Sequence, residues 1–104
     1  IAPLVAKTDL DYVEAFTPAP DTDMTVKEAL DAWPDKVLWI HFPSSVHLES
    51  SDVIEAKTLE ILDQAGSGNR LIVGITEDIP SDHWQKSMST ISRVLNARGQ
   101  LPLC

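Results

Sequence analysis

Cysteine, glycine and basic residues are scarce in this sequence, and each scarcity excludes a class of protein. The 104 residues include one cysteine, Cys104, so neither an internal disulfide nor a CxxC pair can form. With only four glycines, the sequence lacks the G-x-G-x-x-G and G-x-x-x-x-G-K-[ST] loops that bind dinucleotides and phosphates, and it also lacks H-E-x-x-H. Eight basic residues against sixteen acidic ones give a net charge of −8, which argues against a nucleic-acid partner because phosphates repel an acidic surface.

Long apolar runs are missing as well. No stretch approaches the ~20 apolar residues that span a bilayer, so we expect no membrane partner and a cytoplasmic protein. A hydrophobic content of 43% is ample for a packed core, and the length predicts a single domain over residues 1–104. Because the chain begins Ile1-Ala2-Pro3 rather than with methionine, we expect a fragment, a processed product or a trimmed chain.

Three short apolar runs have the character of β-strands: residues 12–16, 37–42 and 71–75. They are continuous rather than alternating, which is typical of strands covered on both faces in a parallel sheet. Each gap between them is long enough for a crossover helix, and each run is followed by a loop that contains proline. The pattern predicts an α/β fold of parallel βα repeats.

The helices between these runs have recognisable ends. Thr25 and Glu28 form a capping box, and the helix they open ends near Trp33 because Pro34 follows. A second helix opens at Ser51-Asp52, a third opens at Ser81-Asp82 and ends at Gly99, and residues 2–7 resemble the end of a further helix. The inner faces are expected at Ile54, Thr58, Ile61, Leu62 and Ala65 in the second helix and at Trp84, Met88, Ile91 and Leu95 in the third.

Three parallel strands make a poor free-standing domain. Both edge strands lack a neighbour, and helices on one side leave the other face of the sheet exposed to water. We therefore expect either a slice of a larger α/β domain or a homo-oligomer in which chains cover one another.

Two polar residues lie within the predicted strands. Glu14 is in the middle of the first, where an isolated carboxylate is costly to bury, and His41 is one residue before the end of the second. Both are candidate catalytic residues, as acid, base or ligand. The alternatives are that Glu14 pairs with a cation on a neighbouring element and that His41 is a hydrogen-bonded core histidine.

Further polar residues follow the strands, where ligands gather in parallel α/β folds. Glu77 comes immediately after the third strand and is the third candidate catalytic residue. Candidate substrate-binding residues are Thr17, Ser44, Ser45 and Asp78; the last has the alternative role of placing negative charge near the start of a helix. His47 and His83 are expected to be surface histidines.

Two long segments, DYVEAFTPAPDTDMTVKEALDAWPDKVLWIHFPSS at residues 11–45 and LIVGITEDIPSDHWQKSMSTISRVLN at residues 71–96, resemble the carboxyl-terminal part of the uroporphyrinogen decarboxylase superfamily. This superfamily also includes cobalamin-dependent and corrinoid methyltransferases. The resemblance implies a TIM-type (β/α)8 barrel, of which this chain supplies about three β/α units, and a small-molecule substrate for the full-length parent.

The sequence also departs from that family's patterns. The decarboxylases carry a Gly-His-Gly-Ile-Pro-like stretch after the last strand, and zinc methyltransferases place a cysteine ligand nearby, but here Glu77 stands at that position. Arg70, Arg93 and Arg98 lie before a strand or within a helix, so no arginine clamp for a polycarboxylate tetrapyrrole is visible. The reaction, decarboxylation or methyl transfer, therefore stays open, and zinc or a corrinoid is expected only for the methyltransferase type.

Two functions remain. The first is part of a decarboxylase-like or methyltransferase-like enzyme, inactive as an isolated chain. The second is a non-catalytic α/β module that self-associates or binds a partner.

Overall fold

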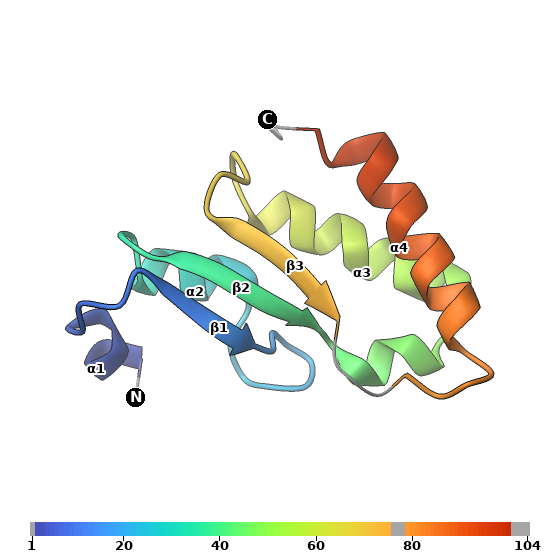
Figure 1. Ribbon diagram of the computed structural model, residues 1–104, viewed down its shortest axis with the longest axis horizontal. Helices are drawn as coiled ribbons and strands as arrows, with labels where there is room; N and C mark the ends of the chain where they lie inside the picture. The colour runs from blue at the N-terminus through green and yellow to red at the C-terminus, as the bar shows by residue number, and fades with distance from the viewer. Residues whose placement is uncertain (1, 76–78, 101–104) are drawn as a thin grey trace.

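The computed structural model describes residues 2–75 and 79–100 and shows an α/β fold built on one sheet (Figure 1). Its elements follow in the order α1 (Ala2–Ala6), β1 (Tyr12–Phe16), α2 (Val26–Ala32), β2 (Val37–Phe42), the 3₁₀ helix η1 (Ser44–Leu48), α3 (Ser51–Gln64), β3 (Leu71–Ile75) and α4 (Trp84–Arg98). The predicted strands are confirmed. Within the part described, no helix is both long and apolar enough to cross a membrane.

The described sheet is wholly parallel, with its three strands in the sequential order β1-β2-β3. Val13 pairs with Leu38, and Ile40 pairs with Val73, so β2 is the central strand. Because all three strands run the same way, the loops after Phe16, Phe42 and Ile75 leave from the same end of the sheet, here called the carboxyl end.

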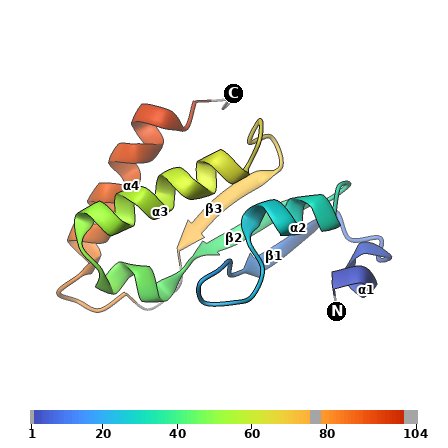
Figure 2. The ribbon, with the colours of Figure 1, turned by 180° about the vertical axis from the view of Figure 1, so that it is seen from behind.

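Both helices that connect the strands, α2 and α3, lie on one face of the sheet, behind it in Figure 1 and in front of it in Figure 2. The core lies between them: Leu38, Ile40 and Phe42 of β2 are at most 2% exposed. They pack with buried residues of the surrounding helices, among them Val26, Ala29 and Leu30 of α2, Trp33 just after it, Val46 of η1, Ile54 and Ile61 of α3 and Ile91 of α4.

The opposite face of the sheet is uncovered, as expected for a single layer of helices. This open face consists of Tyr12, Glu14, Trp39, His41, Ile72 and Gly74, and Trp39 and Ile72 are 37% and 45% exposed. The prediction of strands covered on both faces is therefore wrong for this chain. The apolar runs are continuous because the strand positions between the core residues hold Trp39 and Ile72, where polar side chains would be usual.

Local signals in the sequence explain the helix ends. Thr25 and Glu28 form the predicted capping box, with the Thr25 hydroxyl accepting from the Glu28 amide at 3.1 Å. Ser50 rather than Ser51 caps α3, since its hydroxyl accepts from the Val53 amide. Beyond α3, Gly66 and Gly68 have φ values of +65° and +81°, which side chains disfavour.

The inner face predicted for α3 is confirmed, but the one predicted for α4 is partly wrong. Its buried residues are Ser87, Thr90, Ile91 and Val94, whereas Trp84 and Met88 are exposed. α4 packs chiefly on α3 (Figure 1). It also makes a hydrogen bond next to η1: the ammonium group of Lys86 donates to the backbone carbonyl of Glu49, which follows that element. Small polar residues face this contact, and of the predicted stripe only Ile91 is among the buried residues.

Candidate functional site

Glu14 and His41 lie on neighbouring strands and face each other across the open face of the sheet. The Nε2 atom of His41 is 3.4 Å from Oε1 of Glu14. The Glu14 side chain is 50% exposed and that of His41 26% exposed, so neither carries the full cost of burial. The structure brings these two predicted catalytic residues together, and the alternative that Glu14 pairs with a cation on a neighbouring element stays open, since His41 is a cation only when protonated.

Aromatic and small residues complete the surroundings of this pair. Tyr12 and Trp39 contact each other with ring centroids 6.3 Å apart. Gly74 is the register partner of His41, and the Trp39 indole leans over it, since a Cβ added at Gly74 would lie 3.0 Å from Nε1 of Trp39. The pair therefore lies beside an exposed aromatic surface, at the half of the sheet nearer its carboxyl end.

Chemically, a carboxylate beside an imidazole can hold or move a proton. Such a pair is suited to general acid–base work on a substrate that lies on the open face.

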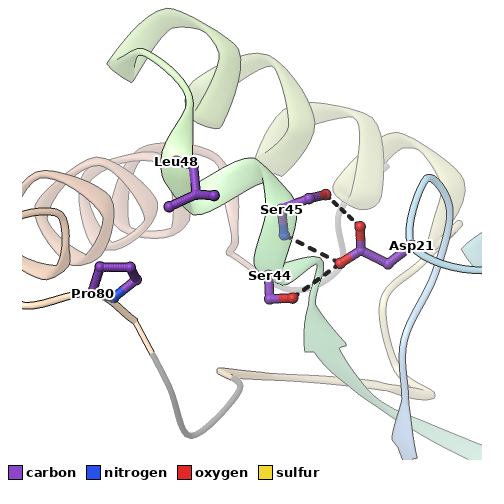
Figure 3. Close-up of a pocket in the computed structure, with 5 residues that line it drawn as sticks. All are labelled: Asp21, Ser44, Ser45, Leu48 and Pro80. Carbon is purple, nitrogen blue, oxygen red and sulfur yellow. Dashed lines mark hydrogen bonds between the residues drawn. The ribbon is translucent and has the colours of Figure 1, made fainter.

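A second polar cluster lies at the carboxyl end of the sheet, in a hollow of about 450 Å³ lined by Asp21, Ser44, Ser45, Leu48 and Pro80 (Figure 3). These residues come from the three loops that follow β1, β2 and β3. One Asp21 oxygen accepts from the Ser44 hydroxyl and from the Ser45 amide, each at 3.2 Å. The other accepts from the Ser45 hydroxyl.

The charge on Asp21 follows from these bonds. Partial burial raises the pKa of Asp21, but the hydrogen bonds from Ser45 and Ser44 lower it by more, so the pKa of this carboxyl lies below its usual value. Asp21 is therefore ionised at neutral pH. The two serines were predicted to bind substrate; Asp21 was missed, because nothing in its own loop shows that it bridges to the next one.

Thr17 does not line this hollow. It lines a different depression, together with Glu14, and its backbone carbonyl accepts from the Thr22 hydroxyl at 2.6 Å. Glu77 and Asp78 lie outside the described residues, so their predicted roles stay predictions. Within residues 2–75 and 79–100, no three His, Cys, Asp or Glu side chains cluster as metal ligands would.

His47 was expected at the surface but is fully buried. It lies on η1, its Nδ1 contacts the Ser87 hydroxyl of α4, and its ring packs 5.0 Å from that of Phe42. Burial lowers the pKa of His47, and the nearby charge of Asp21 offsets this only in part. In the sequence, only the apolar neighbours Val46 and Leu48 indicated that His47 lies against the core, and Leu48 is itself exposed.

Comparisons of the chain with protein-family models, with curated proteins and with solved structures found no match. The family resemblance of the sequence therefore stays a prediction.

Proposed function

We propose that this chain is part of a uroporphyrinogen decarboxylase-like enzyme, of decarboxylating or corrinoid-linked methyl-transferring type, whose site includes Glu14, His41 and Glu77. One observation carries the proposal. Three parallel strands follow one another in sequence, with the connecting helices on one face and an acid–base pair on the other. This is the arrangement of consecutive units of a (β/α)8 barrel, in which the helices lie outside and the face that carries the pair lines the interior.

The pair fits the proton chemistry of decarboxylation. When the bond to the leaving CO₂ breaks, its electron pair stays on carbon and must take up a proton. His41 is placed to donate that proton, and Glu14, 3.4 Å from its Nε2 atom, holds the ring in position. Glu77 follows β3 in the sequence and is proposed as a further acid or base at the same end of the sheet.

The tetrapyrrole itself is a less suitable substrate than a smaller or less acidic relative. Among the arginines, Arg70 donates to the carbonyls of Leu30, Trp33 and Lys36, and Arg93 pairs with Glu55 at 2.8 Å. Neither is available to bind substrate carboxylates. A zinc site is also unsupported by the donor set, because the described residues contribute only Glu14 and His41 to this face, so we derive no step through a metal.

The test uses the chain within its complete reading frame. Glu14→Gln and His41→Gln each keep a side chain of similar size, and we expect each to lower turnover by about 10²–10⁴-fold, whether assayed as CO₂ release or as methyl transfer from a corrinoid. Glu49→Gln, at an exposed residue beyond η1, is the matched control and should leave turnover unchanged. Full activity in both site variants would overturn the assignment.

The isolated 104-residue chain should be inactive, because most of the barrel is absent from it. Turnover by the isolated chain would contradict the proposal that its site needs further strands.

A second function is favoured by the exposed apolar residues of the open face. Tyr12, Trp39 and Ile72 form a contiguous surface there, and β1 and β3 each lack a neighbour on one side within the described sheet. A non-catalytic module that assembles with itself would bury this surface. It would need neither Glu14 nor His41 for activity, and the same variants therefore separate the two proposals.

A further inference from the structure

The hollow at the carboxyl end of the sheet has the chemistry of a binding site for one class of ligand. The Asp21 hollow, as it is called here, is defined by Asp21, Ser44, Ser45, Leu48 and Pro80. These residues are separate from Glu14 and His41, so ligand binding in the hollow does not depend on the proposed function.

The polar groups of the hollow that remain free to bind a ligand are hydrogen-bond acceptors. Both serine hydroxyls and the Ser45 amide direct their hydrogens at Asp21. What the serines still offer are oxygen lone pairs, and each carboxylate oxygen retains further accepting capacity. A ligand that satisfies the polar wall must therefore donate hydrogen bonds; an anion or a pure acceptor finds no side-chain donor among the described residues that line the hollow while these bonds are in place.

The charge of the hollow points to the same class. Asp21 is ionised at neutral pH, and among the described residues no lysine, arginine or histidine nitrogen lies within 4.0 Å of its carboxylate. The net charge of −8 adds an attraction for cations over the whole molecule. Within the described residues, Asp21 is thus an anion without a cationic partner.

The opposite wall is apolar. Leu48 is 55% exposed, although it belongs to the same 3₁₀ helix as the fully buried His47, and in Figure 3 Leu48 and Pro80 lie on the side of the two serines away from Asp21. At about 450 Å³ the hollow is within the size range of small-molecule sites. A purely inorganic cation would leave this apolar wall unused.

We propose that the Asp21 hollow binds a small organic cation, whose ammonium or guanidinium group donates to Asp21, Ser44 and Ser45 while a short hydrocarbon segment packs on Leu48 and Pro80.

The experiment is an NMR titration of the ¹⁵N-labelled chain with n-butylammonium chloride at constant ionic strength. We expect saturable shifts at the amides of Ser44, Ser45 and Leu48, with weaker binding of methylammonium, which lacks the apolar segment. Sodium butyrate and 1-butanol match butylammonium in hydrocarbon length and should cause no saturable shift. Equal shifts from butyrate and butylammonium, or no saturation by any ammonium ion, would overturn the proposal.

Variants locate the effect. Asp21→Asn keeps an oxygen acceptor for the serines but removes the charge, and it should weaken butylammonium binding at least about tenfold. Asp23→Asn removes an equal charge from the same loop outside the hollow and should leave binding unchanged. Equal losses in both would show that only general charge attracts the ligand, and would overturn the site.

Three further variants test the site in case Asp21→Asn disturbs the loop. Ser45→Ala preserves the carboxylate and should bind within a few-fold of wild type. Leu48→Ser should abolish the preference for butylammonium over methylammonium, and retention of that preference would contradict the proposed apolar wall. Glu14→Gln should bind normally, which separates this site from the proposed catalytic pair.

Discussion

Lys36 is the largest of the fully buried side chains, and its surroundings explain how a lysine is tolerated in the core. It is 2% exposed, and its Nζ donates at 2.9 Å to each of two backbone carbonyls, those of Thr8 and Leu10. The carboxylate of Asp35 lies 3.9 Å away but is largely exposed, so water screens it. The two carbonyls lie in the segment between α1 and β1, and Lys36 therefore fastens this segment to the start of β2.

Lys36→Met tests this role. Methionine keeps the hydrocarbon volume but leaves two carbonyls without their donor, and we expect a loss of about 1–3 kcal/mol in the free energy of unfolding. Chemical denaturation measures it. Lys27→Met removes a lysine whose ion pair with Asp31 is exposed, and it should leave the midpoint near that of wild type. A similar small effect at both positions would contradict the buried role of Lys36.

His47 predicts a pH dependence of stability. Its pKa is lowered in the folded chain, so the unfolded chain binds more protons as the pH falls. The stability contributed by neutral His47 is thus fully present above the unfolded value of about 6.5 and is lost as the pH falls through the lowered folded value.

Thermal unfolding between about pH 7.5 and pH 5.5 checks this prediction, since histidines are the side chains that titrate there. His47→Gln should be less stable than wild type at the upper pH and should lose less stability on acidification. The control, His83→Gln, changes a partly exposed histidine and should keep the wild-type pH slope. An unchanged slope in the His47 variant would show that this ring is not held neutral by burial.

At the scale of elements, α4 shows what sequence patterns can and cannot predict. The strands, the α2 capping box and the inner face of α3 were predictable, because each depends on short-range spacing and on residues with one strong preference. The buried side of α4 was not predictable, because it faces polar contacts with distant residues. Ser87 contacts His47 of η1, and Lys86 donates to the Glu49 carbonyl just beyond η1. The bond between Asp21 and the serines was hidden for the same reason, because it joins residues 23 and 24 positions apart.

The orientation of α4 is tested by two truncations. Ile91 is 3% exposed and belongs to the core, so Ile91→Ala should cost about 2–5 kcal/mol. Met88, three residues earlier, is 37% exposed, and Met88→Ala should cost much less. Denaturant unfolding of both variants decides the matter: a loss at Met88 as large as that at Ile91 would mean that α4 is rotated towards the stripe expected from its sequence, which contained both residues.

At the scale of the whole molecule, the two faces of the sheet differ in how they are covered. Helices α2 and α3 bury one, while Tyr12, Trp39 and Ile72 are exposed on the other. Apolar residues gathered on one face favour association. Both proposed functions account for the exposed apolar face: it is either part of the interior of a larger barrel or a contact between copies of the chain.

Light scattering of the isolated chain over a range of concentrations tests the exposed apolar surface. We expect the average mass to rise with concentration, and we expect Trp39→Lys to reduce that rise by placing a charge in the centre of the open face. Glu60→Gln, which changes an exposed residue of α3 on the other side of the molecule, controls for the change in net charge because it also makes the chain more positive by one charge. A monomer at every concentration would count against a sheet face that requires a cover.

An experimental structure of the protein over its whole reading frame is the most direct test of the proposed barrel. The account predicts further parallel strands alongside β1 and β3 in one closed sheet, with Glu14 and His41 directed into its interior. Helices packed over Trp39 and Ile72, or an antiparallel strand beside β3, would contradict it.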